Sequence, residues 1–280
     1  MALKSLRTRL LLPLFALAVV MAALPAVAGA QAASTGRVRV MHASPDAPAV
    51  DIFVDGQKAV TALAFPKDTG YVSLPAGKHN VRVFISPSNG SGTPALQADL
   101  DIAGGKDYTV LAVGEAGKNT LALLPLEDNN AAPAAGNAHV RLIHASPDAP
   151  AVDVVVAGTS PKVFSNIPFR GVGAYTPVPA NTYNLDVKVA SSGAVAKSIT
   201  GLQLKDRTVY TAVAVGLAGN GTLQVIPLVD AAAPVTPSAP STGTGTMADG
   251  GFAWAAVGFG LIAVAGTLWF ARKARATTRA

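Results

Sequence analysis

Hydrophobic and polar residues alternate along two long stretches of the chain, residues 36–128 and residues 138–230. Gly, Pro, Asn and Asp bound the alternating runs, and outside the two termini no segment keeps a 3.6-residue period with helix caps. A period of two between turn residues is typical of β-strands. In the first stretch the predicted strands are residues 38–42, 52–54, 71–74, 81–85, 95–102, 108–113 and 120–124. Seven or so short strands in about ninety residues predict an all-β fold, an antiparallel, immunoglobulin-like β-sandwich.

The two stretches are copies of one another. The decapeptide HASPDAPAVD occurs at residues 42–51 and again at residues 144–153, an offset of 102 positions. The similarity returns with the same offset between residues 108–128 and residues 210–230. A unit of about ninety residues has the size of a domain, not of a solenoid repeat. We therefore expect two tandem β-sandwich domains, residues 36–128 and 138–230, joined by an Ala/Pro/Gly-containing linker at residues 129–137.

The N-terminal segment predicts export. Lys4, Arg7 and Arg9 precede an apolar run at residues 10–24, and small residues follow it. This order is typical of a secretory signal peptide, which we place at residues 1–32. A retained N-terminal anchor is the alternative interpretation.

The C-terminal segment predicts a membrane anchor. Residues 251–271 carry no charge and are numerous enough to span a bilayer as a helix, with Trp254 and Trp269 near the two ends. Four basic residues follow within residues 272–280. The positive-inside rule places this tail in the cytoplasm. The expected topology is a single-pass protein of the cell membrane, with its N-terminal region outside the cell.

A stalk is expected before the span, because residues 231–250 are rich in Ala, Pro, Thr, Ser and Gly and lack apolar periodicity. Within it, Ala239, Pro240, Ser241, Thr242 and Gly243 resemble the sortase motif Leu-Pro-x-Thr-Gly, with Ala in place of Leu. Cleavage between Thr242 and Gly243 would attach the protein to the cell wall. The other interpretation is a plain membrane stalk.

Composition and charge exclude several classes of protein. Hydrophobic residues make up 50% of the 280 positions, which excludes a disordered polyelectrolyte. The chain has no Cys, so disulfide scaffolds, zinc-thiolate sites and cysteine nucleophiles are excluded. The formal charge is +6, but seven of the 22 basic residues lie in the two terminal segments. The remaining 15 basic residues are balanced by 16 acidic residues, so nucleic acid is not expected as a partner.

The repeated decapeptide is the candidate site. Its two prolines cannot continue a strand, and its first Asp can bind the backbone of the turn. One interpretation is purely structural: polar side chains lock the loop. The other is that they converge at one end of the sandwich and bind a polar ligand or a cation. The candidate residues are His42, Ser44, Asp46 and Asp51, and in the second copy His144, Ser146, Asp148 and Asp153.

Catalysis is not expected from this motif. A catalytic triad is assembled from distant segments, whereas residues two apart on a strand point the same way and do not face each other. The sequence carries no phosphate loop, dinucleotide fingerprint or zinc helix. We therefore expect no enzyme activity, no catalytic residues, no metal centre and no cofactor.

The strings RVRVMHASPDAPAVDIFVDG from Arg37 and HVRLIHASPDAPAVDVVVAG from His139 resemble the domain of unknown function 4397 family. The resemblance implies exported bacterial domains, often in tandem, with β-sandwich character and no established activity. The expected function is surface display, adhesion or a structural role, with the membrane as partner. The alternative is an extracellular module whose HASPDAP loops bind a carbohydrate or a cell-wall polymer.

Overall fold

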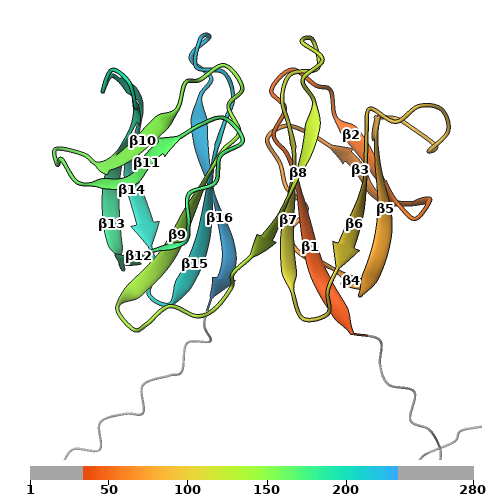
Figure 1. The fold of residues 1–280 in the computed structure, drawn as a ribbon, viewed down its shortest axis with the longest axis horizontal. Coiled ribbons are helices and arrows are strands. Elements are labelled where there is room, and N and C mark those ends of the chain that lie inside the picture. Colours follow the sequence, from red (N-terminus) through yellow and green to blue (C-terminus); the bar gives the residue numbers. More distant parts are fainter. Residues whose placement is uncertain (1–33, 233–280) are drawn as a thin grey trace, which may run out of the picture. The chain divides into compact units, whose positions relative to one another are not determined.

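The structure is a computed structural model that describes residues 34–232 (Figure 1). These residues form sixteen strands in four sheets of four strands each. The prediction of an all-β chain built from two similar units is confirmed. Within residues 34–232 there is no helix of the length and apolarity that a membrane span requires. The predicted signal peptide, sorting motif, membrane span, basic tail and most of the predicted stalk lie outside the described residues.

Repeat 1 consists of the first eight strands. An inner sheet has the strand order β4-β1-β7-β8, and an outer sheet has the order β3-β2-β5-β6. The strands are β1 (Thr35–His42), β2 (Val50–Val54), β3 (Gln57–Leu63), β4 (Val72–Pro75), β5 (Gly77–Ile85), β6 (Leu96–Ile102), β7 (Asp107–Val113) and β8 (Ala122–Asp128).

Repeat 2 has the same topology. Its inner sheet is β12-β9-β15-β16, and its outer sheet is β11-β10-β13-β14. The strands are β9 (Asn137–His144), β10 (Val152–Val156), β11 (Lys162–Ile167), β12 (Thr176–Pro179), β13 (Asn181–Val189), β14 (Val195–Leu204), β15 (Thr208–Val215) and β16 (Gln224–Ala232).

The prediction of purely antiparallel sheets is wrong at one strand pair in each repeat. β1 runs parallel to β7 over six paired positions, and β9 runs parallel to β15 in the same way. Parallel neighbours need a long connection, here residues 43–106 in repeat 1. No hairpin signal therefore marks this pairing in the sequence.

β3 was not predicted from the sequence. This edge strand is mostly exposed, and Ala62 interrupts it with a positive φ of 51°. The registers between β2 and β3 shift twice along the pair. Alternation is the signal that identifies strands, and a bulged, solvent-facing strand loses it.

Each repeat encloses an apolar core between its two sheets. In repeat 1 it contains Val38 and Val110 from the inner sheet and Ile52 and Val83 from the outer sheet. The core of repeat 2 is built from the equivalent strands. Burial of these side chains supplies the main driving force for each sandwich.

A third apolar core joins the two repeats. It is formed by the faces of the inner sheets that point away from the cores described above, and its members are Met41, Ala43, Leu111, Val113, Ile143, Ala145, Val213, Val215 and Leu228. All except Leu228 are fully buried. The central strands of both inner sheets are therefore buried on both faces over much of their length. We call this contact the junction.

Candidate functional site

His42 is the last residue of β1, and its side chain is 1% exposed. Its Nε2 donates a hydrogen bond to the carbonyl oxygen of Pro48 at 3.0 Å, and its ring packs edge-on against Phe65. Burial lowers the pKa of this imidazole, so the ring is neutral at pH 7. His42 thus fixes the position of Pro48 in its own loop.

Asp46 ties the same loop to the β7–β8 hairpin. Its two carboxylate oxygens accept hydrogen bonds from the amides of Ala116 and Gly117, each at 2.8 Å. The hydroxyl of Ser44 donates to the same carboxylate at 3.2 Å. Desolvation opposes ionisation of Asp46, but the two amides and the hydroxyl outweigh it and lower the pKa of the carboxyl group. The loop and the hairpin therefore hold each other in place.

Asp51 lies in β2 and binds a different part of the molecule. Its buried carboxylate accepts hydrogen bonds from Lys58 Nζ at 2.8 Å, from the amide of Ala62 at 2.8 Å and from the amide of Ser88 at 2.9 Å. The lysine and the amides together hold the pKa of Asp51 far below its usual range. This Asp thereby stabilises the bulge at Ala62.

Repeat 2 has most of the equivalent contacts. His144 donates to the carbonyl of Pro150, Asp148 accepts from the amides of Ala218 and Gly219, and Asp153 binds Lys162 and the amide of Asn166. Ser146 donates to the carbonyl of Gly216 at 2.7 Å.

The structure does not bring the candidate residues together around one ligand. In repeat 1, His42 binds its own loop, Asp46 the hairpin, and Asp51 the outer sheet. Across residues 34–232, no group of three or more His, Asp or Glu side chains is placed to hold a metal ion. The contacts that do form are those of a loop locked by its own polar side chains.

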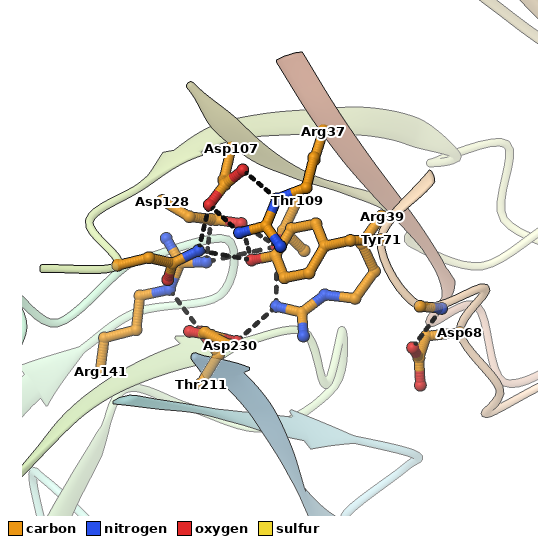
Figure 2. Close-up of polar contacts among 12 residues, drawn as sticks. Arg37, Arg39, Asp68, Tyr71, Asp107, Thr109, Asp128, Arg141, Thr211 and Asp230 are labelled. Atoms are coloured by element: carbon orange, nitrogen blue, oxygen red, sulfur yellow. Dashed lines mark hydrogen bonds and ion pairs between the residues drawn. The ribbon is translucent and has the colours of Figure 1, made fainter. Parts of the chain in front are cut away.

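A second polar cluster lies at the junction (Figure 2). Arg39 of β1 donates from Nη2 to Asp230 of β16 at 2.7 Å and to Thr109 at 2.9 Å. Arg141 of β9 pairs with Asp128 of β8 and donates to Thr211 at 2.8 Å. The arginine side chains are 2% and 3% exposed and the aspartates 0%. These are fully desolvated ion pairs between the two repeats.

Two tyrosines complete this cluster. The guanidinium of Arg39 lies 4.7 Å from the ring centre of Tyr71, and that of Arg141 lies 4.8 Å from that of Tyr175. Tyr71 donates to Asp128, and Tyr175 donates to Asp230 at 3.1 Å. Burial is the main cause that raises the pKa of both phenols, so they remain protonated donors. Each aspartate thus accepts from a tyrosine of its own repeat and an arginine of the other.

The junction is self-complementary. Arg39 and Arg141 are equivalent by the offset of 102, and so are Asp128 and Asp230. Arg39 pairs with Asp230 while Arg141 pairs with Asp128, so each contact is made twice with the roles of the repeats exchanged. This is the arrangement of an isologous interface, normally found between identical subunits.

The junction was not predicted from the sequence, although a signal for it is present. Residues 108–113 read YTVLAV, which is apolar or uncharged on both faces. Strands buried on both faces have such continuous runs, whereas a strand with one solvated face alternates. The apolar Met41 among the polar positions of β1 is a second sign of the same buried face.

The strand directions set the position of the loops. β1 and β7 are parallel and β7 continues into the hairpin, so the hairpin and the HASPDAP loop lie at the end of repeat 1 opposite Thr35. Repeat 2 has the same order, and Arg170 Nη2 donates to the carbonyl of Thr120 in the hairpin of repeat 1. Both hairpins therefore lie at one end of the pair, and the start of β1 and the end of β16 lie at the other (Figure 1).

Comparison with known proteins gives one family match. The family model of the domain of unknown function DUF4397 matches residues 36–155 and 138–241. No curated protein has a significantly similar sequence.

Several solved structures show a weak likeness. The TIE protein of Bacillus anthracis is 11% identical with a TM-score of 0.22, and the match covers 66% of this chain and 34% of that protein. This chain thus spans about a third of the length of that protein. The fimbrial anchor protein Mfa2 of Porphyromonas gingivalis is 10% identical with a TM-score of 0.21, covering 70% and 97% of the two chains. A carbohydrate-binding module of Eubacterium rectale Amy13K, crystallised with maltoheptaose, is 10% identical with a TM-score of 0.22, covering 69% and 96%. TM-scores of this size do not define a shared fold.

Proposed function

The chain belongs to the DUF4397 family, and from this membership and the junction we propose that it is a non-enzymatic display or adhesion protein anchored at the cell surface. The observation that carries the proposal is the orientation of the two repeats. Buried ion pairs and a continuous apolar core fix the repeats side by side, with both hairpins at the end opposite Ala232. A stalk that continues from Ala232 would hold both hairpins away from the membrane.

Burial of the two histidines of the decapeptide supports a non-enzymatic role. His42 and His144 are buried and donate to carbonyls of their own loops. A general base must reach the substrate proton, directly or through one water molecule. Neither imidazole offers such access in this fold.

The proposed location rests on the sequence of the terminal segments. Residues 1–32 direct export, residues 251–271 cross the membrane once, and residues 272–280 remain in the cytoplasm. Cleavage at the APSTG segment, residues 239–243, would instead transfer the protein to the cell wall.

Surface exposure is tested with an epitope tag inserted after residue 34 of the full chain, expressed in an export-competent bacterium. We expect protease added to intact cells to remove the tag, and truncation after residue 250 to release the protein into the medium. A Thr242→Ala variant separates the two anchors, because only sortase attachment requires this residue. A tag that is protected in intact cells, or a truncated chain that stays cell-bound, contradicts the proposal.

The alternative function, binding of a carbohydrate or cell-wall polymer, is supported by the pre-formed hairpins. Asp46 and Asp148 hold equivalent hairpin amides in equivalent positions, so each chain offers two equivalent loop sets at one end. Binding to a panel of glycans and purified wall polymers tests this role. The expected result is retention by one polymer that falls in the Asp46→Ala and Asp148→Ala variants. Retention that both variants leave unchanged would place the binding elsewhere.

A further inference from the structure

The contacts across the junction do not require that the two repeats belong to one chain. Both buried ion pairs are made by side chains on strands, and the apolar core is built from equivalent positions of both repeats. An isologous surface forms a dimer whenever a second copy is available. The only covalent restraint between the repeats is the linker, residues 129–136.

The length of the linker sets how far apart the two repeats of one chain can lie. Eight residues separate β8 from β9, and fully extended they bridge about 30 Å. In the closed chain it is partly fixed, because Asn130 Nδ2 donates to Asp107 at 2.6 Å and Pro133 is buried. Extension of the linker would break these local contacts but none of the ion pairs of the junction.

We propose that the junction face is a homotypic binding surface whose partner is a second copy of this chain. Two chains exchange repeats, so that repeat 1 of each packs on repeat 2 of the other. The charge pattern fits this partner, because every exchanged repeat meets the same Arg, Asp, Tyr and apolar side chains as in the closed chain.

Local concentration decides between the closed and exchanged forms. A short linker holds the repeats at an effective concentration on the order of millimolar, so the closed form dominates in dilute solution. Separation of a formed junction exposes a continuous apolar core and two buried ion pairs. Exchange therefore takes place while the chains fold, and crowding at a surface favours it.

Matched charge reversals test the exchange. One full-length chain carries Arg39→Asp and a second, with a different tag, carries Asp230→Arg. In either chain alone, the closed form places two like charges at the buried site. In an exchanged pair, the reversed Asp meets the reversed Arg, and the other site keeps the natural Arg39–Asp230 pair. The chains are co-expressed and purified in detergent through both tags in sequence.

We expect at least tenfold more doubly tagged complex from the matched pair than from either variant co-expressed with its own differently tagged copy. These like-with-like pairs also control for chance co-occupancy of a micelle. One chain with both reversals should return to the monomer. A second variant, deletion of Ala131 and Ala132, shortens the linker from eight residues to six. This should disfavour closure and give a dimer by light scattering. Equal recovery from matched and unmatched pairs, or a monomeric deletion variant, overturns the proposal.

Discussion

Removal of the Asp230 carboxylate should destabilise the described fold far more than loss of any surface ion pair. The carboxylate accepts hydrogen bonds from Arg39, Thr211 and Tyr175. In Asp230→Ala the Arg39 side chain, which is 2% exposed in the structure, loses its counter-ion, and among the described residues its Nε already lacks a partner. Breaking a buried ion pair from one side costs about 3–5 kcal/mol. The matched control is Glu127→Ala, because Lys106 and Glu127 are 2.7 Å apart but each 54% exposed. An exposed pair contributes about 0–1 kcal/mol.

The difference between the two variants is large on the scale of folding. The total stability of a domain is about 5–15 kcal/mol. For a segment of this size, a loss of 3–5 kcal/mol lowers the melting temperature by roughly 6–20 °C. Urea and thermal unfolding of residues 34–232, monitored by far-UV circular dichroism, measure this loss of stability. The reasoning also predicts that Arg39→Met with Asp230→Leu recovers most of the loss, since an apolar pair leaves no buried charge. A loss in Asp230→Ala within 1 kcal/mol of that in Glu127→Ala would refute the assignment.

Three further outcomes follow from the fold. His79 is held through both ring nitrogens, and its hydrogen bonds to the Pro75 carbonyl and to Asp55 raise its pKa. Its contribution to stability is therefore complete below about pH 6.5, the pKa of a free His. The contribution is lost as pH rises through the higher pKa of the folded state. Unfolding free energies measured against pH should show this decline, and His79→Tyr should remove it. A pH profile that His79→Tyr leaves unchanged would exclude a role of these two hydrogen bonds. Asp46→Ala should speed hydrogen exchange at the two hairpin amides it binds and leave the Asp148 hairpin unchanged; equal exchange rates in wild type and variant would count against the anchor. Gly114→Ala should cost clearly more stability than Gly158→Ala: both positions have positive φ, but an added Cβ lies 2.2 Å from a backbone oxygen at Gly114 and meets nothing within 4 Å at Gly158. Equal losses in thermal melts would mean that the backbone contact at Gly114 is relieved.

The repetition and the β-strands were predictable because both leave a local record in the sequence. Residues 42–51 recur as residues 144–153, and the period of two is visible in strands such as β1 and β5. The parallel pairing of β1 with β7 leaves no such record, because it joins segments about seventy positions apart. The same holds for the ion pair between Arg39 and Asp230, which are 191 positions apart.

The role of the decapeptide was only partly accessible from sequence. The residue types indicate a loop with polar side chains, and the structure shows such a loop. The partners of Asp46 and Asp51 are mostly backbone amides. An amide is present at every position except proline, so residue identities at positions 62, 88, 116 and 117 carry no mark of these contacts. This is why the hairpin anchor and the bulge at Ala62 could not be assigned beforehand.

The course of β16 has a mechanical consequence. This edge strand starts beside the hairpin of repeat 2, ends at Ala232, and is paired with β15 from Gln224 to Ala232. Tension between that hairpin and the C-terminal end of the described region would act along the strand, across hydrogen bonds that lie perpendicular to it. The ladder would then be loaded in shear, with its bonds sharing the force instead of opening one after another. The order of strands in repeat 2 thus makes β16 the strand that bears this force.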